Sequence, residues 1–172
     1  RAGLGLGHGE IKCRMVLVCL GDARTCRWMG AFAQESADEY GSSREEMDAY
    51  AIESLERAQN ASSSGVLASE IVPVTVSSRK GDVLVKDDEQ PLNANLEKIP
   101  TLKPAFRKDG TITAANASSI SDGASALVMM RESTARQMGC TPLARIVSHA
   151  VHAQAPEWFA TAPAGAIAKA LK

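Results

Sequence analysis

The sequence has no excess of charge of either sign. Its 172 residues include 19 Lys and Arg against 20 Asp and Glu, which gives a formal net charge of -1. Proteins that bind nucleic acid usually carry a basic excess, so this balance argues against a nucleic-acid partner. No apolar segment approaches the length of roughly 20 residues that a transmembrane helix needs, so we expect no membrane partner. The hydrophobic fraction of 45% is ordinary for a globular protein.

Cysteine is scarce, and its spacing excludes the common zinc and redox motifs. The sequence contains no Cys-x-x-Cys pair and no histidine at zinc-finger spacing from a cysteine. A signal peptide is also missing, because the first ten residues lack a charged region followed by an apolar one. We interpret the four cysteines as reduced thiols of a cytoplasmic protein. They are Cys13, Cys19, Cys26 and Cys140.

The two ends of the sequence lack the features of natural termini. The chain begins with Arg1 and not with methionine, and a helical pattern continues through Lys172. We therefore expect an internal fragment of a longer protein. The GLGLGHG sequence at 3–9 superficially suggests a phosphate-binding loop, but no strand precedes it and the G-K-[ST] ending is missing. We interpret residues 1–12 as a flexible loop.

Periodic apolar residues predict two helices in the first half of the chain. The first covers residues 29–40 and ends at Gly41, a residue typical of helix C-termini. Ser43 and Glu46 form an S-x-x-E capping box that begins the second helix, and the SSSG sequence at 62–65 ends it. The predicted buried faces consist of Met29, Phe32, Ala33, Ala37 and Tyr40, and of Met47, Tyr50, Ala51, Leu55 and Ala58.

Alternating apolar residues predict strands. EIVPVTVS at 70–77 and VLVK at 83–86 form a predicted hairpin around the RKGD turn, with Pro73 favouring an edge position. Farther along, the apolar runs predict buried strands and the periodic segments predict helices. The predicted strands are 126–130 and 144–153, and the predicted helices are 132–139 and 161–172. The second part of the chain is therefore expected to be α/β.

The sequence TITAANASSISDGASALVMM at 111–130 is unusually rich in small residues. It contains one asparagine, Asn116, and one aspartate, Asp122. We expect these two side chains to satisfy backbone groups rather than to perform chemistry.

Several long stretches, in one order, make the chain similar to the thiolase family and most closely to the acetyl-CoA acetyltransferases. The resemblance covers nearly the whole chain. The matching stretches are MGAFAQ at 29–34, SREEMDAYAIESLERA at 43–58, EIVPV at 70–74, RKGD at 79–82, LKPAFRKDGTITAANAS at 102–118, DGASALVMM at 122–130, PLARIVS at 142–148 and PEWFATAPAGAIAKAL at 156–171.

The resemblance implies an α/β fold. Thiolases are layered α/β/α/β/α sandwiches of two similar halves, and a loop domain inserted in the first half covers the coenzyme A site. By resemblance, residues 1–118 are most of that loop domain, 119–141 are the end of the N-terminal half, and 142–172 are the start of the C-terminal half.

The resemblance also implies an activity for the whole protein. Thiolases join two acetyl-CoA molecules by Claisen condensation or cleave a 3-ketoacyl-CoA in reverse, through a cysteine that carries the acyl group. The whole enzyme would be an acetyl-CoA C-acetyltransferase. It would be cytoplasmic, free of metal and a homo-oligomer (dimer or tetramer). Coenzyme A would be part of its substrates and not a permanently bound cofactor. The alternatives are a 3-ketoacyl-CoA thiolase of fatty-acid degradation, a non-catalytic module that binds coenzyme A or a thiolase subunit, and a truncated product that does not fold stably.

No catalytic residue is carried over to this chain. The family's nucleophilic cysteine precedes the region of residue 1, and its NEAF, GHP and CxGGG motifs follow the region of Lys172, so the chain alone is expected to be inactive. What the resemblance implies instead is a pocket for pantetheine, a thin amide-bearing arm that needs apolar walls and a few polar contacts. The apolar walls are Leu20, Met29 and Phe106, the polar contacts are the Ala114 backbone and the Ser118 hydroxyl, and Phe159 lies near the acyl group. From the residues alone, a cap of the following turn is the favoured role of Ser118, and the match of TAANAS to the family favours the pantetheine contact instead.

Overall fold

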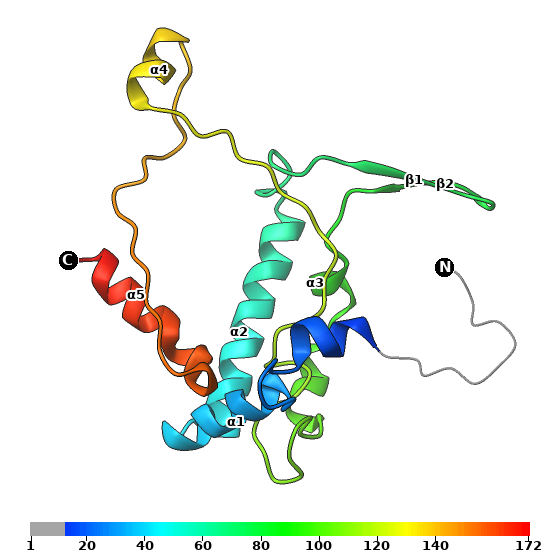
Figure 1. Cartoon of the computed structure of the whole chain (residues 1–172). Coiled ribbons are helices and arrows are strands. Elements are labelled where there is room, and N and C mark those ends of the chain that lie inside the picture. Colours follow the sequence, from blue (N-terminus) through cyan, green and yellow to red (C-terminus); the bar gives the residue numbers. More distant parts are fainter. Residues whose placement is uncertain (1–12) are drawn as a thin grey trace, which may run out of the picture. The chain divides into compact units, whose positions relative to one another are not determined.

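The computed structural model describes residues 13–172 and divides into two compact units, Arg1–Ser118 and Ser119–Lys172 (Figure 1). The glycine-rich stretch that we interpret as a flexible loop lies outside the described residues. The first unit contains most of the regular structure. Its elements are the π-helix η1 (Val16–Leu20), α1 (Met29–Glu39), α2 (Arg44–Ser63), β1 (Val74–Ser78), β2 (Gly81–Val85), α3 (Glu89–Asn93) and the 3-10 helix η2 (Leu96–Thr101).

The two predicted helices of the first unit are confirmed, and their junction forms as the sequence indicates. Gly41 adopts a positive φ of 64°, which ends α1 without a Cβ clash. The Ser43 hydroxyl accepts a hydrogen bond from the Glu46 backbone N–H at 3.2 Å, and the Glu46 carboxylate accepts one from the Ser43 backbone N–H at 3.0 Å. These bonds from Ser43 lower the pKa of Glu46 below its usual value. The capping box therefore begins α2 with two of its free N–H groups satisfied.

The predicted hairpin is also confirmed. β1 and β2 pair antiparallel, with Val74 opposite Val85 and Ser78 opposite Gly81. Gly81 has a φ of 111°, a conformation that requires glycine at this turn. Every residue of both strands is exposed. Within the described residues this hairpin is the only sheet, and Figure 1 shows it as a two-stranded ribbon.

The core of the first unit differs from the predicted apolar faces. Phe32, Ile99 and Ile112 are buried, but Tyr40 and Tyr50 are 67% and 78% exposed, so their predicted burial is wrong. Three polar residues are buried in the two helices instead, because their side chains find hydrogen-bonding partners: two of them in the loop that follows η2, and the Ser36 hydroxyl at the Phe32 carbonyl within α1. They are Gln34, Ser36 and Asp48.

The second unit contains the predicted helices as α4 (Glu132–Gln137) and α5 (Ala162–Ala170), with the 3-10 helix η3 (Pro156–Thr161) before α5. The two predicted strands are wrong: residues 126–130 and 144–153 form no ladder, and nearly all of them are exposed. A strand needs a neighbouring strand for its backbone hydrogen bonds, and the described part of this unit supplies none. An apolar run alone therefore did not produce a strand.

α5 contacts the segment before η3 through Gly165 and Lys169. A Cβ on Gly165 would lie 2.7 Å from the His152 ring, so only glycine allows this approach. The Lys169 ammonium donates to the Val151 carbonyl at 3.1 Å. His152 Nε2 and Gln154 Oε1 lie 3.2 Å apart, and the Gln154 amide donates to the Thr161 hydroxyl at 2.7 Å. These contacts fix the chain on both sides of η3.

Candidate functional site

The loop from Thr111 to Ser118 is held by hydrogen bonds within the loop and to both helices of the first unit. Its Thr113 is fully buried, and its Thr113 carbonyl accepts from the Ala117 N–H at 3.1 Å. The Thr113 N–H donates to the Asn116 side-chain oxygen at 2.7 Å, and the Ala115 N–H donates to the Thr113 hydroxyl at 3.3 Å. The loop is therefore a compact turn with almost all of these polar groups satisfied internally.

α1 holds the beginning of this loop through Gln34, which is 2% exposed. The Gln34 oxygen accepts from the N–H groups of Thr111 and Ile112 at 2.9 and 3.2 Å. The Gln34 amide donates to the Thr111 hydroxyl at 3.1 Å and to Asp38 at 3.0 Å. One buried amide thus replaces the backbone partners that a strand would have offered to the loop.

α2 holds the end of the loop through Asp48, whose side chain is 8% exposed. Its two carboxylate oxygens have different partners: Arg44 Nε donates to one at 2.6 Å, and Asn116 Nδ2 donates to the other at 3.0 Å. Asn116 Nδ2 also donates to the Thr111 carbonyl at 3.0 Å. The prediction that Asn116 satisfies backbone groups is confirmed, whereas Asp122 is exposed.

Arg44 connects the same carboxylate to the end of η2. Its Nη2 group donates to the carbonyls of Ile99 and Leu102 at 3.2 and 2.9 Å. Carbonyls at a helix C-terminus lack internal partners, and a guanidinium satisfies them well. Arg44 therefore fixes η2, and through Asp48 the loop, to α2.

An ion pair at the surface extends the contacts of α1. Arg107 binds the Asp38 carboxylate with two nitrogens at 2.5 and 3.0 Å. The hydrogen bond from Arg107, followed by the one from Gln34, lowers the pKa of Asp38. Hydrogen bonding to Asp38 correspondingly raises the pKa of Arg107. Both groups therefore carry their charge at neutral pH.

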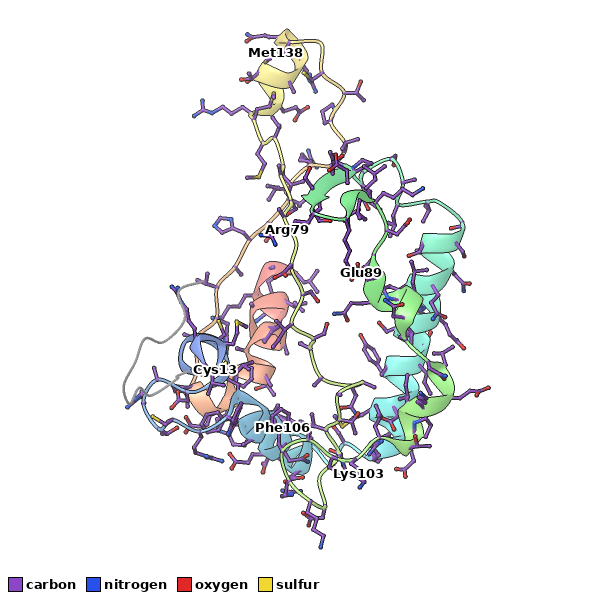
Figure 2. All side chains as sticks on the ribbon, turned by 90° about the vertical axis from the view of Figure 1, so that its right-hand side faces the viewer. Cys13, Arg79, Glu89, Lys103, Phe106 and Met138 are labelled. Carbon is purple, nitrogen blue, oxygen red and sulfur yellow. The ribbon has the colours of Figure 1, made fainter. Side chains whose placement is uncertain are left out.

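Three of the expected pocket residues lie near one another in the first unit. Gly21 and Trp28 form an antiparallel bridge, so Leu20 and Met29 lie at the two ends of the same bridged loop. Both side chains are half-buried. The Phe106 ring lies against Gly30, where an added Cβ would be 2.1 Å from the ring, and Figure 2 labels Phe106 beside the start of α1. The ring is 39% exposed.

The expected polar contacts lie on the exposed side of the loop. Ala114 and Ser118 are exposed, although their neighbours Ile112 and Thr113 are buried. The Ser118 hydroxyl makes no hydrogen bond to the described part of the chain, so it does not cap a turn there. Phe159 belongs to the second unit, where it lies in η3 and is 39% exposed.

The sequence analysis did not identify three supporting residues, which are Gln34, Asp48 and Arg44. A usable signal did exist. Arg44 and Asp48 are four residues apart, the spacing of an ion pair on one helix face. Nothing local distinguished this pair from the exposed pair of Glu53 and Arg57.

The exposed side of the Thr111–Ser118 loop presents groups that can bind a ligand. No three His, Cys, Asp or Glu side chains within residues 13–172 gather in a potential metal site. The helices of that part of the chain include none long and apolar enough to span a membrane. The groups available to a ligand are the Ser118 hydroxyl, the backbone groups beside Ala114, and the apolar side chains of Leu20, Met29 and Phe106.

Comparison with known families gives one family match. Residues 1–133 match the family described as "Thiolase, N-terminal domain". A Dictyostelium discoideum protein named "Probable acetyl-CoA acetyltransferase" is 47% identical over 173 residues, which are 100% of this chain and 42% of that protein. A Staphylococcus aureus protein named "Probable acetyl-CoA acyltransferase" is 41% identical over 174 residues, 100% of this chain and 44% of that protein. The chain thus spans less than half the length of these curated relatives.

Solved structures give the same result for the fold. The Bacillus anthracis acetyl-CoA acetyltransferase matches 99% of this chain and 43% of its own with a TM-score of 0.88 at 41% identity. The human mitochondrial 3-ketoacyl-CoA thiolase matches 99% of this chain and 44% of its own with a TM-score of 0.79 at 36% identity. The chain therefore has the α/β fold of the corresponding part of these enzymes.

Proposed function

The chain belongs to the thiolase family, and we propose that it forms part of the coenzyme A site of an acetyl-CoA C-acetyltransferase. In this proposal the Thr111–Ser118 loop receives the pantetheine arm. Ser118 donates or accepts a hydrogen bond at a pantetheine amide, and the backbone at Ala114 meets a second amide. Leu20, Met29 and Phe106 form the apolar walls, and Phe159 lies near the acyl group.

The observation that carries this proposal is the difference between the two sides of the loop. Thr113 is fully buried, whereas Ala114 and Ser118 are exposed and the Ser118 hydroxyl makes no hydrogen bond to the described residues. A small methyl side chain beside exposed backbone leaves room for a thin ligand. The near approach of Leu20, Met29 and Phe106 supports an apolar wall in the same unit.

The reaction itself belongs to the full-length protein in this proposal. A cysteine outside this chain would carry the acyl group, and coenzyme A would enter and leave as a substrate part. We assign residues 1–118 to the loop domain, 119–141 to the end of the N-terminal half and 142–172 to the start of the C-terminal half. The full-length protein would be a cytoplasmic homo-oligomer. This chain alone would bind without turning over substrate.

A second candidate function is a 3-ketoacyl-CoA thiolase of fatty-acid degradation. The similarity to the human mitochondrial enzyme of that name favours it. The pantetheine site would be the same for both, because both substrates carry the same arm. Comparing turnover of acetoacetyl-CoA and of a long-chain 3-ketoacyl-CoA by the full-length protein separates the two.

Replacing Ser118 with alanine is expected to weaken binding of coenzyme A by roughly 3- to 10-fold, because one net hydrogen bond is worth about 1 kcal/mol. Isothermal titration of the chain with coenzyme A measures the change. The matched control is Ser119→Ala, which removes a hydroxyl whose partner is Ser121. Equal affinity of wild type and Ser118→Ala would contradict the assigned contact. A wild-type chain that produces neither heat nor a shift in melting temperature would contradict the whole site.

A further inference from the structure

The Thr111–Ser118 loop is held by side chains and not by a sheet. Its contacts to the helices come from Gln34 in α1 and from Asp48 in α2, and each of these residues is buried. The two partners are 77 and 68 residues from their contacts in the loop. The shape of the loop is therefore set by two helices that begin far earlier in the chain.

Asn116 is the point through which α2 acts on the loop. Its oxygen accepts from the Thr113 N–H, and its nitrogen donates both to Asp48 and to the Thr111 carbonyl. An asparagine side chain with three directed bonds has one orientation. Because the Asn116 oxygen accepts from the Thr113 N–H, its orientation sets the peptide between Ile112 and Thr113. The next peptide, between Thr113 and Ala114, is held through its carbonyl, which accepts from the Ala117 N–H. That peptide adjoins the backbone assigned to pantetheine.

We infer that Asp48, acting through Asn116, and Gln34 are positioning residues of the pantetheine site. They orient the loop so that the Ala114 backbone and the Ser118 hydroxyl meet the pantetheine amides together. This inference rests on the proposed function. Neither residue touches the ligand, so their contribution is to keep the exposed contacts in the bound arrangement before binding, which lowers the cost of ordering the loop.

The Asp48→Asn substitution separates this role from a general role in stability. An asparagine has one oxygen, so it satisfies either Arg44 or Asn116 and presents its amide group to the other. The charged Arg44 binds the single oxygen of the new asparagine at position 48 in preference to Asn116. The hydrogen bond from Asn116 is therefore lost, while the side chain at position 48 keeps its shape and volume. Asn116→Ala removes the same contact from the loop side. The control on the same helix is Glu56→Gln, an exposed residue with no partner among the described residues.

The experiment titrates the chain with coenzyme A and with adenosine 3′,5′-bisphosphate, which keeps the adenosine, the 3′-phosphate and one 5′-phosphate of coenzyme A but has no pantetheine. We expect the variants Asp48→Asn and Asn116→Ala to bind coenzyme A about tenfold more weakly. In both variants the Thr111–Ser118 loop has to be ordered when the ligand binds, and one of its contacts to pantetheine is displaced. Their affinity for the bisphosphate stays within about twofold of wild type, as does that of Glu56→Gln for both ligands. Equal loss for both ligands, or unchanged binding of coenzyme A, overturns the inference.

Amide hydrogen exchange of Thr113 and Ala117 tests the loop without any ligand. Both N–H groups are hydrogen-bonded within the loop. We expect exchange to be at least tenfold faster in Asp48→Asn than in wild type, because the turn opens more often. Unchanged exchange overturns the positioning role even when coenzyme A binds. A wild-type chain that does not bind coenzyme A, with faster exchange in the variant, rejects the proposed function but leaves the control of the loop by Asp48 established.

Discussion

Replacing Arg44 with methionine is expected to lower the free energy of unfolding by about 3 kcal/mol, near the lower end for breaking a buried ion pair. The substitution leaves the Asp48 carboxylate buried beside Asn116 alone. It also removes the guanidinium that donates hydrogen bonds to the carbonyls at the end of η2. The partial exposure of Arg44, 20% for the side chain, keeps the loss below the upper end of the range. Chemical denaturation followed by circular dichroism measures it.

Arg57→Met is the matched control, because Arg57 forms an ion pair at the same four-residue spacing in the same helix. The side chains of Arg57 and Glu53 are 77% and 60% exposed. An exposed pair of this kind contributes less than about 0.5 kcal/mol. Equal effects of the two substitutions would show that Arg44 and Asp48 form an ordinary surface pair and do not anchor the loop.

Replacing Gly30 with alanine is expected to destabilise the chain by about 1–2 kcal/mol, the usual cost of overpacking. The new Cβ would lie 2.1–2.4 Å from three atoms of the Phe106 ring, which has to move. The better helix propensity of alanine offsets at most about 1 kcal/mol of this cost. Thermal unfolding gives the net change. A displaced Phe106 ring would also no longer form its part of the apolar wall of the proposed site, so binding of coenzyme A is expected to weaken.

A double-mutant cycle with Phe106→Ala isolates the contact between Gly30 and Phe106. In the Phe106→Ala background the ring is gone, and Gly30→Ala is expected to become neutral or stabilising. A change of sign between the two backgrounds assigns the effect to the ring. Destabilisation by the same amount in both would place the conflict elsewhere in α1.

The parts of the fold that the sequence predicted correctly depend on neighbours in the chain. The capping box at Ser43, the glycine at position 41 and the alternating residues around Gly81 act over three to five residues, and the structure confirms all of them. The strand predictions at 126–130 and 144–153 failed because a strand depends on a partner. No local pattern reports whether that partner is present in the chain.

The supporting contacts of the candidate site were not predictable for a related reason. Helical periodicity places polar residues on the outside, so Gln34 and Asp48 were not expected to be buried. Their burial depends on loop residues 77 and 68 positions away. The six expected ligand contacts came from family resemblance. They remain predictions, supported by the exposure of Ala114 and Ser118 and by the near approach of Leu20, Met29 and Phe106.

The central claim is that the Thr111–Ser118 loop receives pantetheine. The most direct test is an NMR titration of the isotope-labelled chain with coenzyme A. We expect the largest amide shift changes at Ala114, Ala115 and Ser118, with smaller changes near Phe106. Amides of the hairpin from Val74 to Val85 should stay unchanged. Saturable changes confined to residues outside this loop, with Ala114 and Ser118 unaffected, would contradict the claim.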